Sequence, residues 1–438
     1  MLPLTFQQQW LLERALQHTE WHCSSGYTYR LKGVLDLDVL RRSFKEIVRR
    51  HGSLRVRIVS IEGATGQAID DASPGQMDIV PIHGTSDEEI VTNAHRAAEA
   101  LYDLRVNLST GPLWTVAVLR LRDREHWLVL VMHRLIAECS SIERVFQELR
   151  SLYDELKDGC PSTFPSAPPQ YADYAALQHK TRGDWAKRHE VYWSDRLAAA
   201  APMHWPVDAD VAVSTPASPG KVSRSFGSAL SIGVRELAQK LRVLSATIML
   251  AVYAATLWRW SRQNDFVLPF NVAGRQSEHR PVVGYFSYIL YLRVELAGEE
   301  TFREFLSRIT NEFYRALAHQ DFGRIATQRP DLLAGTLFQW TTWHPDDAAR
   351  PASGASTDSR VLAIDRVPIR EFGEGLTIAP PSMVDVEITL FDTVDELCAL
   401  GTYRADRFTA QTMERFTADL CYLTEQFVRN PDARLAAL

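Results

Sequence analysis

The sequence predicts a mixed α/β protein built from two lobes of ordinary domain size. The chain has 438 residues, which is too long for one simple hydrophobic core. Helical and strand-like patterns alternate along it, as is typical of layered α/β architectures. Between two such series lies a Pro-rich stretch, Asp158 to Gln170, which is typical of an extended linker. We therefore expect one lobe over residues 1–175 and a second over residues 176–438.

The first lobe is expected to contain two amphipathic helices separated by a pair of strands. Asp38 is placed to cap the first helix and Gly52 to end it. The apolar residues of this helix share one face: Leu40, Phe44, Ile47 and Val48. Strands are predicted over Thr115 to Leu121 and Trp127 to Met132, on either side of a charged turn. The second helix directs a similar set inward: Ile142, Val145, Phe146, Leu149 and Leu152.

The second lobe repeats this style. Helices are predicted over Val234 to Leu241 and Thr247 to Trp260, and strands over Phe266 to Val272 and Ile289 to Leu296. A long helix then carries apolar residues at helical spacing: Phe302, Phe305, Leu306, Ile309, Phe313 and Leu317. The stretch from His344 to Arg360 is rich in Asp, Ala, Ser, Pro and Gly, which predicts a mobile surface loop.

Composition narrows the class of protein and its setting. A hydrophobic fraction of 46% and a charged fraction of 23% are typical of a soluble globular protein, and a formal charge of −6 argues against a nucleic-acid partner. The N-terminus lacks a signal peptide, and no apolar run reaches the ~20 residues that a membrane span needs. The five cysteines are scattered, without a CxxC, so we expect reduced thiols in the cytoplasm.

The most informative stretch is VLVMHRLIAECSS, from Val129 to Ser141. An apolar strand delivers His133, a short loop supplies Glu138, and a helix follows. A histidine at a strand end can act as a general base because its pKa lies near neutrality. Taken alone, the residue is better explained as a core histidine bonded to the backbone. No metal-ligand spacing and no phosphate-binding glycine loop accompany it.

Further short segments stand at intervals along the chain. These are Leu4 to Leu11 (LTFQQQWL), Arg50 to Arg55 (RHGSLR), Tyr171 to Ala175 (YADYA), Val283 to Tyr288 (VGYFSY), Ala318 to Phe322 (AHQDF) and Leu337 to Gln339 (LFQ). Together with the His133 stretch, which resembles HHxxxDG, they resemble in order the motifs of condensation domains from nonribosomal peptide synthetases. Each motif alone is weak, but the ordered series covers essentially the whole chain.

The resemblance implies a fold, a chemistry and a set of partners. The fold would be two chloramphenicol-acetyltransferase-like lobes in a V, with a central tunnel that passes the His133 motif. Peptidyl or acyl carrier proteins would dock at its mouths and deliver phosphopantetheine-tethered thioesters, so the domain itself would bind no cofactor. The usual reaction is attack of an acceptor amine on the donor thioester. Tunnel-lining candidates are Tyr285, Ser287, Tyr291, Gln339 and Trp340.

The His133 motif differs from the family pattern HHxxxDG at three positions. Arg134 stands where the family places the histidine usually credited with catalysis, and arginine cannot accept a proton at neutral pH. It can still hold a carboxylate or an oxyanion as a fixed cation. The alternative is a structural arginine, salt-bridged to Glu138 four residues on.

Glu138 and Cys139 replace the aspartate and glycine of the family motif. The family acid pairs with an arginine, and Arg275 in the segment from Asn271 to Arg275 matches that position. We therefore predict an ion pair between Glu138 and Arg275 that organises the site. Cys139 adds bulk where glycine leaves room; it is a conceivable nucleophile, although most buried cysteines serve only in packing.

Two functions from different classes fit this pattern. In the first, the domain holds carrier-bound intermediates and recruits a tailoring enzyme, as do the X domains of glycopeptide synthetases, which resemble this chain in Arg134 and recruit a cytochrome P450. In the second, it is an active acyltransferase that forms an amide or ester with His133 retained. The altered motif favours the first.

Related enzyme classes fit less well. Coenzyme A-dependent acyltransferases of the BAHD type have a DFGWG element, which Glu371 to Gly375 resembles only faintly. Epimerisation domains use paired histidines, which this chain lacks. The sequence leaves open whether the protein stands alone or is one part of a synthetase.

Overall fold

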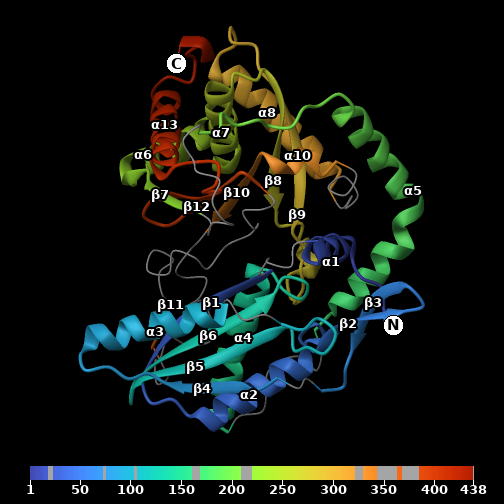
Figure 1. The fold of residues 1–438 in the computed structure, drawn as a ribbon, viewed down its shortest axis with the longest axis vertical. Helices are drawn as coiled ribbons and strands as arrows, with labels where there is room; N and C mark the ends of the chain where they lie inside the picture. Colours follow the sequence, from blue (N-terminus) through green and yellow to red (C-terminus); the bar gives the residue numbers. More distant parts are fainter. Residues whose placement is uncertain are drawn as a thin grey trace. The chain divides into compact units, whose positions relative to one another are not determined.

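The computed structural model describes residues 1–17, 23–72, 75–102, 106–159, 168–208, 220–320, 329–342, 363–366 and 384–437 (Figure 1). These residues form two compact units. Unit 1 holds the described residues of Met1–Arg182, Arg275–Phe286 and Pro345–Ile378, and unit 2 holds those of Gly183–Gly274, Ser287–His344 and Ala379–Leu438. The segment Arg275–Phe286 thus belongs to unit 1, although the chain on both sides of it belongs to unit 2. The lobe boundary predicted between residues 175 and 176 stays a prediction.

Unit 1 is organised by a five-stranded sheet whose strand order is β11-β1-β6-β5-β4. Its central strand β6 pairs antiparallel with β1 on one side and with β5 on the other, whereas the edge strand β4 runs parallel to β5. The bounds are β1 Ser24–Lys32, β4 Met77–Pro81, β5 Trp114–Arg122, β6 Glu125–His133 and β11 Ala363–Arg366; a separate hairpin joins β2 Val56–Ile61 to β3 Ala64–Ile69.

Helices cover both faces of this sheet. Ala94 and Ala98 of α3 pack with Trp127 and other buried residues of β5 and β6, and this cluster forms the core on one face. On the other face, Phe146 of α4 stacks on Tyr29 of β1 with ring centroids 3.4 Å apart. The helices of unit 1 are α1 Phe6–Gln17, α2 Leu37–Arg50, α3 Asp87–Tyr102, α4 Cys139–Lys157 and the first part of α5 Tyr171–Leu197, which continues into unit 2; the 3₁₀ turns are η1 Gly52–Arg55 and η2 Ser277–His279.

The helices and strands predicted for this half of the chain are present, with small shifts at their ends. The cap of α2 is Asp36 rather than Asp38, because the Asp36 carboxylate accepts hydrogen bonds from the backbone N–H groups of Asp38 and Val39. The helix ends at Arg50 with His51 as its C-cap, so Gly52 begins η1 instead of ending α2. Two acids two residues apart leave the capping position ambiguous from sequence alone.

Unit 2 contains a six-stranded mixed sheet in the order β7-β13-β12-β10-β8-β9. Strand β10 lies parallel to β12 and β8, and α7 is buried along most of its length. The bounds are β7 Gly220–Ser225, β8 Asp265–Val272, β9 Tyr288–Glu295, β10 Thr336–Thr342, β12 Val386–Asp392, β13 Leu397–Tyr403, α6 Gly227–Leu241, α7 Ser245–Ser261, α8 Phe302–Ala318, α10 Asp331–Ala334, α13 Ala410–Arg429 and η3 Leu435–Ala437. The helices and strands predicted here are therefore confirmed.

Several sequence-based predictions fall outside the described residues. They are most of the Pro-rich linker, the loop from His344 to Arg360 and the Glu371 to Gly375 segment. Within the described part of the chain, no helix is by itself long and apolar enough to cross a membrane; α6 and α7 pass that test of length and composition only as a pair, bent by 109°.

Candidate functional site

Backbone hydrogen bonds to two neighbouring segments hold the start of the His133 motif. His133 is the last residue of β6, and its backbone N–H donates to the Leu113 carbonyl at 2.8 Å. The Arg134 backbone N–H donates to the Cys23 carbonyl, also at 2.8 Å. A central strand that is bonded on both edges leaves little freedom to the residue at its end. The strand ends here because its apolar run, Trp127 to Met132, is followed directly by two polar residues, His133 and Arg134.

The His133 imidazole is buried and neutral at pH 7. Burial, reinforced by the adjacent Arg134 cation, lowers the pKa of His133 to about 4. Its Nδ1 accepts a hydrogen bond from the backbone N–H of Leu135 at 3.2 Å. In a neutral imidazole one nitrogen accepts and the other carries the proton, so this bond assigns the proton to Nε2. His133 is therefore arranged as a hydrogen-bond donor through Nε2.

Arg134 is buried beside this histidine. Its Nε donates to Ser25 Oγ at 3.2 Å, and 6% of the residue's surface is exposed. Burial raises the pKa of Tyr285 far above its usual range, although the charge and hydrogen bond of Arg134 act in the opposite direction. Burial likewise raises the pKa of the Cys23 thiol to about 12 against the same cation. Tyr285 and Cys23, which lie close to this guanidinium, are thus neutral at pH 7.

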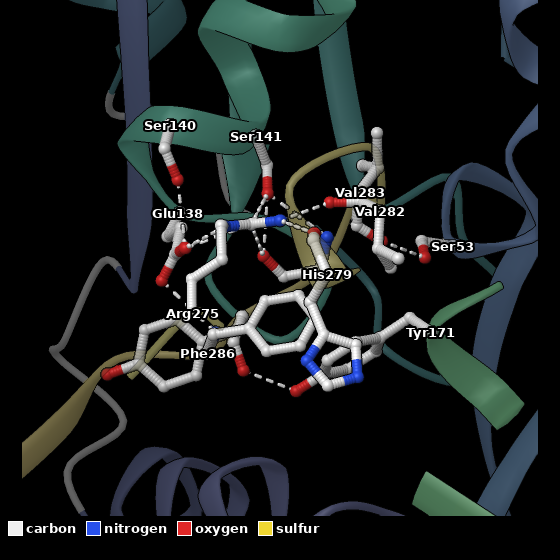
Figure 2. Close-up of polar contacts among 12 residues, drawn as sticks. Ser53, Glu138, Ser140, Ser141, Tyr171, Arg275, His279, Val282, Val283 and Phe286 are labelled. Atoms are coloured by element: carbon white, nitrogen blue, oxygen red, sulfur yellow. Dashed lines mark hydrogen bonds and ion pairs between the residues drawn. The ribbon is translucent and has the colours of Figure 1, made fainter. Parts of the chain in front are cut away.

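The ion pair predicted between Glu138 and Arg275 is present. Glu138 Oε1 accepts from Arg275 Nε at 3.1 Å and from Nη2 at 2.9 Å, and both side chains are more than nine-tenths buried. Figure 2 shows the guanidinium directed at this carboxylate. Glu138 Oε1 also accepts from Ser140 Oγ at 2.9 Å, while Oε2 accepts from the Phe286 backbone N–H at 3.1 Å. The extra methylene of glutamate is thus accommodated without loss of the pair.

Arg275 also organises the segment that follows it. Its Nη1 donates to the carbonyls of His279 at 2.7 Å and Val282 at 2.5 Å, and its Nη2 donates to Ser141 Oγ at 2.7 Å. Its guanidinium carbon lies 4.3 Å from the centroid of the Phe286 ring. One side chain therefore ties the segment Arg275–Phe286 to the N-terminus of α4, as Figure 2 shows.

Residues that sequence analysis did not single out complete this attachment. Ser141 Oγ donates to the Gly284 carbonyl at 2.7 Å, and the Gly284 N–H donates back to it at 3.1 Å. Ser53 Oγ donates to the Val283 carbonyl at 2.6 Å. The Tyr171 hydroxyl donates to the Tyr285 carbonyl. Ser53 and Tyr171 lie in segments that resemble family motifs, and Ser141 ends the His133 stretch, so those segments were the available signal, although nothing in them indicated these contacts.

The segment with Arg50 and His51 holds a buried charge cluster on α4. Glu148 Oε2 lies 3.1 Å from His51 Nε2 and 3.3 Å from Arg50 Nε, and Oε1 accepts from Arg144 Nε at 2.9 Å. Burial opposes ionisation of Glu148, but His51 and Arg144 outweigh it and lower its pKa to about 2. Arg50 and His51 therefore join α2 to α4, whereas Ser53 of the same segment holds Val283.

The remaining candidates are placed as follows. Cys139 begins α4 and is partly exposed, and Tyr285 is buried in unit 1. The other tunnel candidates belong to unit 2: Ser287 precedes β9, Tyr291 is buried on β9, and Gln339 and Trp340 are neighbours on β10. Gln339 accepts from Asn271 Nδ2 at 3.1 Å and donates to Glu387. Their role in a tunnel, like the nucleophile role of Cys139, stays a prediction.

No three His, Cys, Asp or Glu side chains cluster in a way that could hold a metal ion within the described ranges. The polar groups gathered between the end of β6 and the N-terminus of α4 are backbone amides, hydroxyls, the His133 imidazole, the Glu138 carboxylate and the guanidinium groups of Arg134 and Arg275. Such a set can bind anions and orient carbonyl groups.

Comparison with protein families matches residues 1–328 to the Condensation domain model. The chain is 30% identical, over 100% of its length, to a linear gramicidin synthase protein of Brevibacillus parabrevis, of which it covers 8%. It is 28% identical, over 92% of its length, to chondramide synthase cmdD of Chondromyces crocatus, of which it covers 10%. The chain thus spans about a tenth or less of these relatives.

Solved structures share its fold. The condensation domain of the monacolin K polyketide synthase MokA matches 99% of each chain with a TM-score of 0.82 and 16% identity. The X-domain from teicoplanin biosynthesis, solved in complex with OxyB, matches 100% of this chain and 95% of its own with a TM-score of 0.80 and 21% identity. The SgcC5 protein of Streptomyces globisporus matches 99% and 100% with a TM-score of 0.80 and 22% identity.

Proposed function

Because the chain belongs to the condensation-domain family of nonribosomal peptide synthetases, we propose that it is a docking domain for carrier-bound thioester intermediates rather than a condensation catalyst. One observation carries this proposal. Neither side chain at the two positions of the histidine motif is arranged to accept a proton. The family fold of two chloramphenicol-acetyltransferase-like lobes is retained, and on this proposal the group that activates the nucleophile is lost with the change to Arg134.

The two motif positions fail as bases for different reasons. The Arg134 guanidinium stays protonated at any pH at which the protein is folded. At His133 the Leu135 N–H occupies Nδ1, which leaves Nε2 with a proton to donate. A nucleophile that must lose a proton therefore finds two donors and no acceptor at this motif.

The same two groups suit the binding of an intermediate. A fixed guanidinium and an imidazole N–H can both donate to a carboxylate or to a thioester carbonyl. We propose that Arg134 and His133 hold such a group on a carrier-bound peptide, while the pair of Glu138 and Arg275 keeps the segment Arg275–Phe286 in place. On this proposal, Cys139 and the tunnel candidates do not react but determine which substrates fit.

The proposed partners follow from this role. Peptidyl or acyl carrier proteins would present the intermediate on their phosphopantetheine arm, so that the domain needs no bound cofactor of its own. A tailoring enzyme, such as a cytochrome P450, would be recruited to the held intermediate. The X-domain that shares this fold was solved with OxyB, which supports this kind of partner. The proposed setting is the cytoplasm.

An active acyltransferase is the second candidate, favoured by the intact framework around Arg275. Loss of a general base lowers a rate by typically ~10²–10⁴-fold, and proximity of an activated thioester can supply much of the remaining acceleration. On this alternative, His133 or the substrate itself would handle the proton.

The decisive experiment is intact-protein mass spectrometry of an acyl-loaded carrier incubated with candidate amine nucleophiles and the protein. We expect no condensation product from the wild-type protein, while carrier binding is retained. An Arg134→His variant should gain product if the base alone is missing. Wild-type product that disappears in His133→Ala would instead establish the acyltransferase and contradict a docking role.

A further inference from the structure

A groove of about 810 Å³ lies in unit 1, away from the His133 motif. It is bounded by α2 on one side and by residues around β4 on the other. Its volume lies in the range of ligand-binding sites, and none of the residues that line it belongs to the His133 motif or to the segment Arg275–Phe286.

The β4 wall of this groove is the edge of a sheet. Among the described strands, β4 pairs only with β5. The Ile82 N–H just beyond β4 donates to the Arg120 carbonyl of β5 at 3.0 Å. Backbone groups alternate sides along a strand, so Asp78 and Val80 also direct theirs toward β5, whereas Met77 and Ile79 direct theirs outward. No described residue bonds the outward N–H and C=O groups of these two residues, which can therefore pair with another strand.

The floor of the groove is apolar. Phe44 and Val48 of α2 and Met77 of β4 are buried within it, and Ile79 is partly buried. A strand laid along β4 would direct alternate side chains to this floor, since side chains alternate faces with a period of two.

The α2 wall is cationic. Arg41, Lys45 and Arg49 follow one another at intervals of four residues, and Arg42 stands beside them; all are exposed. Arg49 Nε and Nη2 each donate to the Glu46 carboxylate at 2.7 Å, and Arg41 Nη1 lies 3.4 Å from Asp38 Oδ1. No described residue bonds the side chains of Arg42 or Lys45. Three lining acids, Glu46, Asp71 and Asp78, stand against five lining cations that include Arg55, so positive charge predominates.

We propose that this groove binds an extended, acidic peptide segment of a partner protein. The segment adds a strand to the free edge of β4, places apolar side chains on the floor and sets acidic ones against the row from Arg41 to Arg49. An extended chain fits better than a compact anion, because the free backbone groups, the apolar floor and the cationic row lie along one groove. The inference does not depend on the proposed carrier-docking function.

The test uses the full chain and a fluorescently labelled peptide of alternating Glu and Val, measured by fluorescence anisotropy at low salt. We expect saturable binding that Lys45→Glu weakens by about tenfold. Lys180→Glu, an equal charge change at an exposed position of α5, should leave the affinity unaltered. A peptide of the same length and the same number of Glu residues, with proline in place of Val, should not bind, because proline lacks the N–H that pairs with β4.

An Ile79→Pro substitution removes an N–H that makes no bond to β5, so it should abolish binding while the thermal unfolding curve stays close to that of the wild type. Hydrogen exchange should show protection of the Met77 and Ile79 amides in the complex. Equal affinity for the proline-containing peptide, or tighter binding of inorganic polyphosphate that Ile79→Pro leaves intact, would overturn the proposal in favour of a surface that recognises charge alone.

Discussion

Arg275 shows how much of the site depends on a single side chain. Its guanidinium meets the carboxylate of Glu138, the hydroxyl of Ser141 and the carbonyls of His279 and Val282. Each of these groups is buried or half-buried and would need another donor or acceptor if Arg275 were removed. A buried charge that loses its partner is strongly destabilising, whereas a surface pair contributes little.

We therefore expect Arg275→Leu to lower the free energy of unfolding by about 3–5 kcal/mol, because it leaves the Glu138 carboxylate buried without its cation. Glu138→Asp, which keeps the charge, should cost less. Chemical denaturation measures both. The exposed pair of Arg429 and Glu425 provides the control, since Glu425→Gln should change stability by less than about 0.5 kcal/mol. A small effect of Arg275→Leu would show that the pair is not structurally important.

His133 should make stability depend on pH. Its pKa is lowered from 6.5 to about 4 in the folded protein, so the unfolded chain binds the proton more readily between these values. Stability is therefore full above pH 6.5 and falls as the pH decreases toward 4, by up to a few kcal/mol, since one pKa unit corresponds to about 1.4 kcal/mol.

Denaturation curves between pH 4 and 7 should be flatter for His133→Gln than for the wild type. Some slope remains, because the pKa values of His126 and His279 are lowered in the same direction by burial. His204→Gln, at an exposed position, serves as the control. Identical slopes for the wild type and His133→Gln would mean that His133 is not buried in its neutral form.

The segment Arg275–Phe286 is held at the scale of elements by close packing as well as by hydrogen bonds. A Cβ added at Gly284 would lie 2.2 Å from Cδ2 of Tyr171, at the first turn of α5. The Tyr171 ring is itself packed edge-on to Phe286, with centroids 5.1 Å apart. Because the two rings hold each other in place, the Tyr171 ring cannot move away from a side chain at position 284. Glycine is therefore the residue that fits there.

Gly284→Ala should therefore lower stability by about 1–3 kcal/mol, the range typical of overpacking in a core. Gly183→Ala is the matched control: it lies in α5 with no atom within 4 Å of an added Cβ, and it should be neutral or stabilising. Thermal unfolding compares the two. If Gly284→Ala were as stable as the wild type, the packing of Tyr171 against the segment would be looser than the structure indicates.

A helix or strand could be predicted where the spacing of its apolar residues alone determines its structure. The apolar face of α4 and the runs of β5 and β6 were visible in the spacing of their residues, and the structure extends the predicted ranges by only a few residues. Caps were less predictable, as Asp36 in place of Asp38 shows, because capping depends on one backbone angle. Ser141 could not be found, since its role arises from contact with Gly284, far away in sequence.

At the scale of the whole molecule, family motifs supplied what periodicity could not. The pairing of Glu138 with Arg275 joins residues 137 positions apart, and only the matching family segment predicted it. Nothing in the sequence indicated that Leu135 would donate to His133 Nδ1, because that bond depends on the turn that follows β6. The fold could thus be predicted, whereas the protonation of the motif required coordinates.

The chain as a whole retains the family fold, and we propose that it differs in chemistry at the His133 motif. Residues 1–328 match the family model, and the fold extends over essentially the entire chain. Selection for a docking role would preserve such a framework while it relaxes the requirement for a base. The central claim is therefore that the His133 motif presents donors and no acceptor at neutral pH.

The most direct test of this claim is ¹⁵N NMR of the protein labelled at histidine, with His133 assigned by comparison with His133→Gln. We predict a neutral ring at pH 7 whose Nε2 carries the proton and whose Nδ1 has the shift of an acceptor. An unprotonated Nε2, or an imidazolium ring at pH 7, would contradict the claim and make His133 a candidate base or acid for condensation.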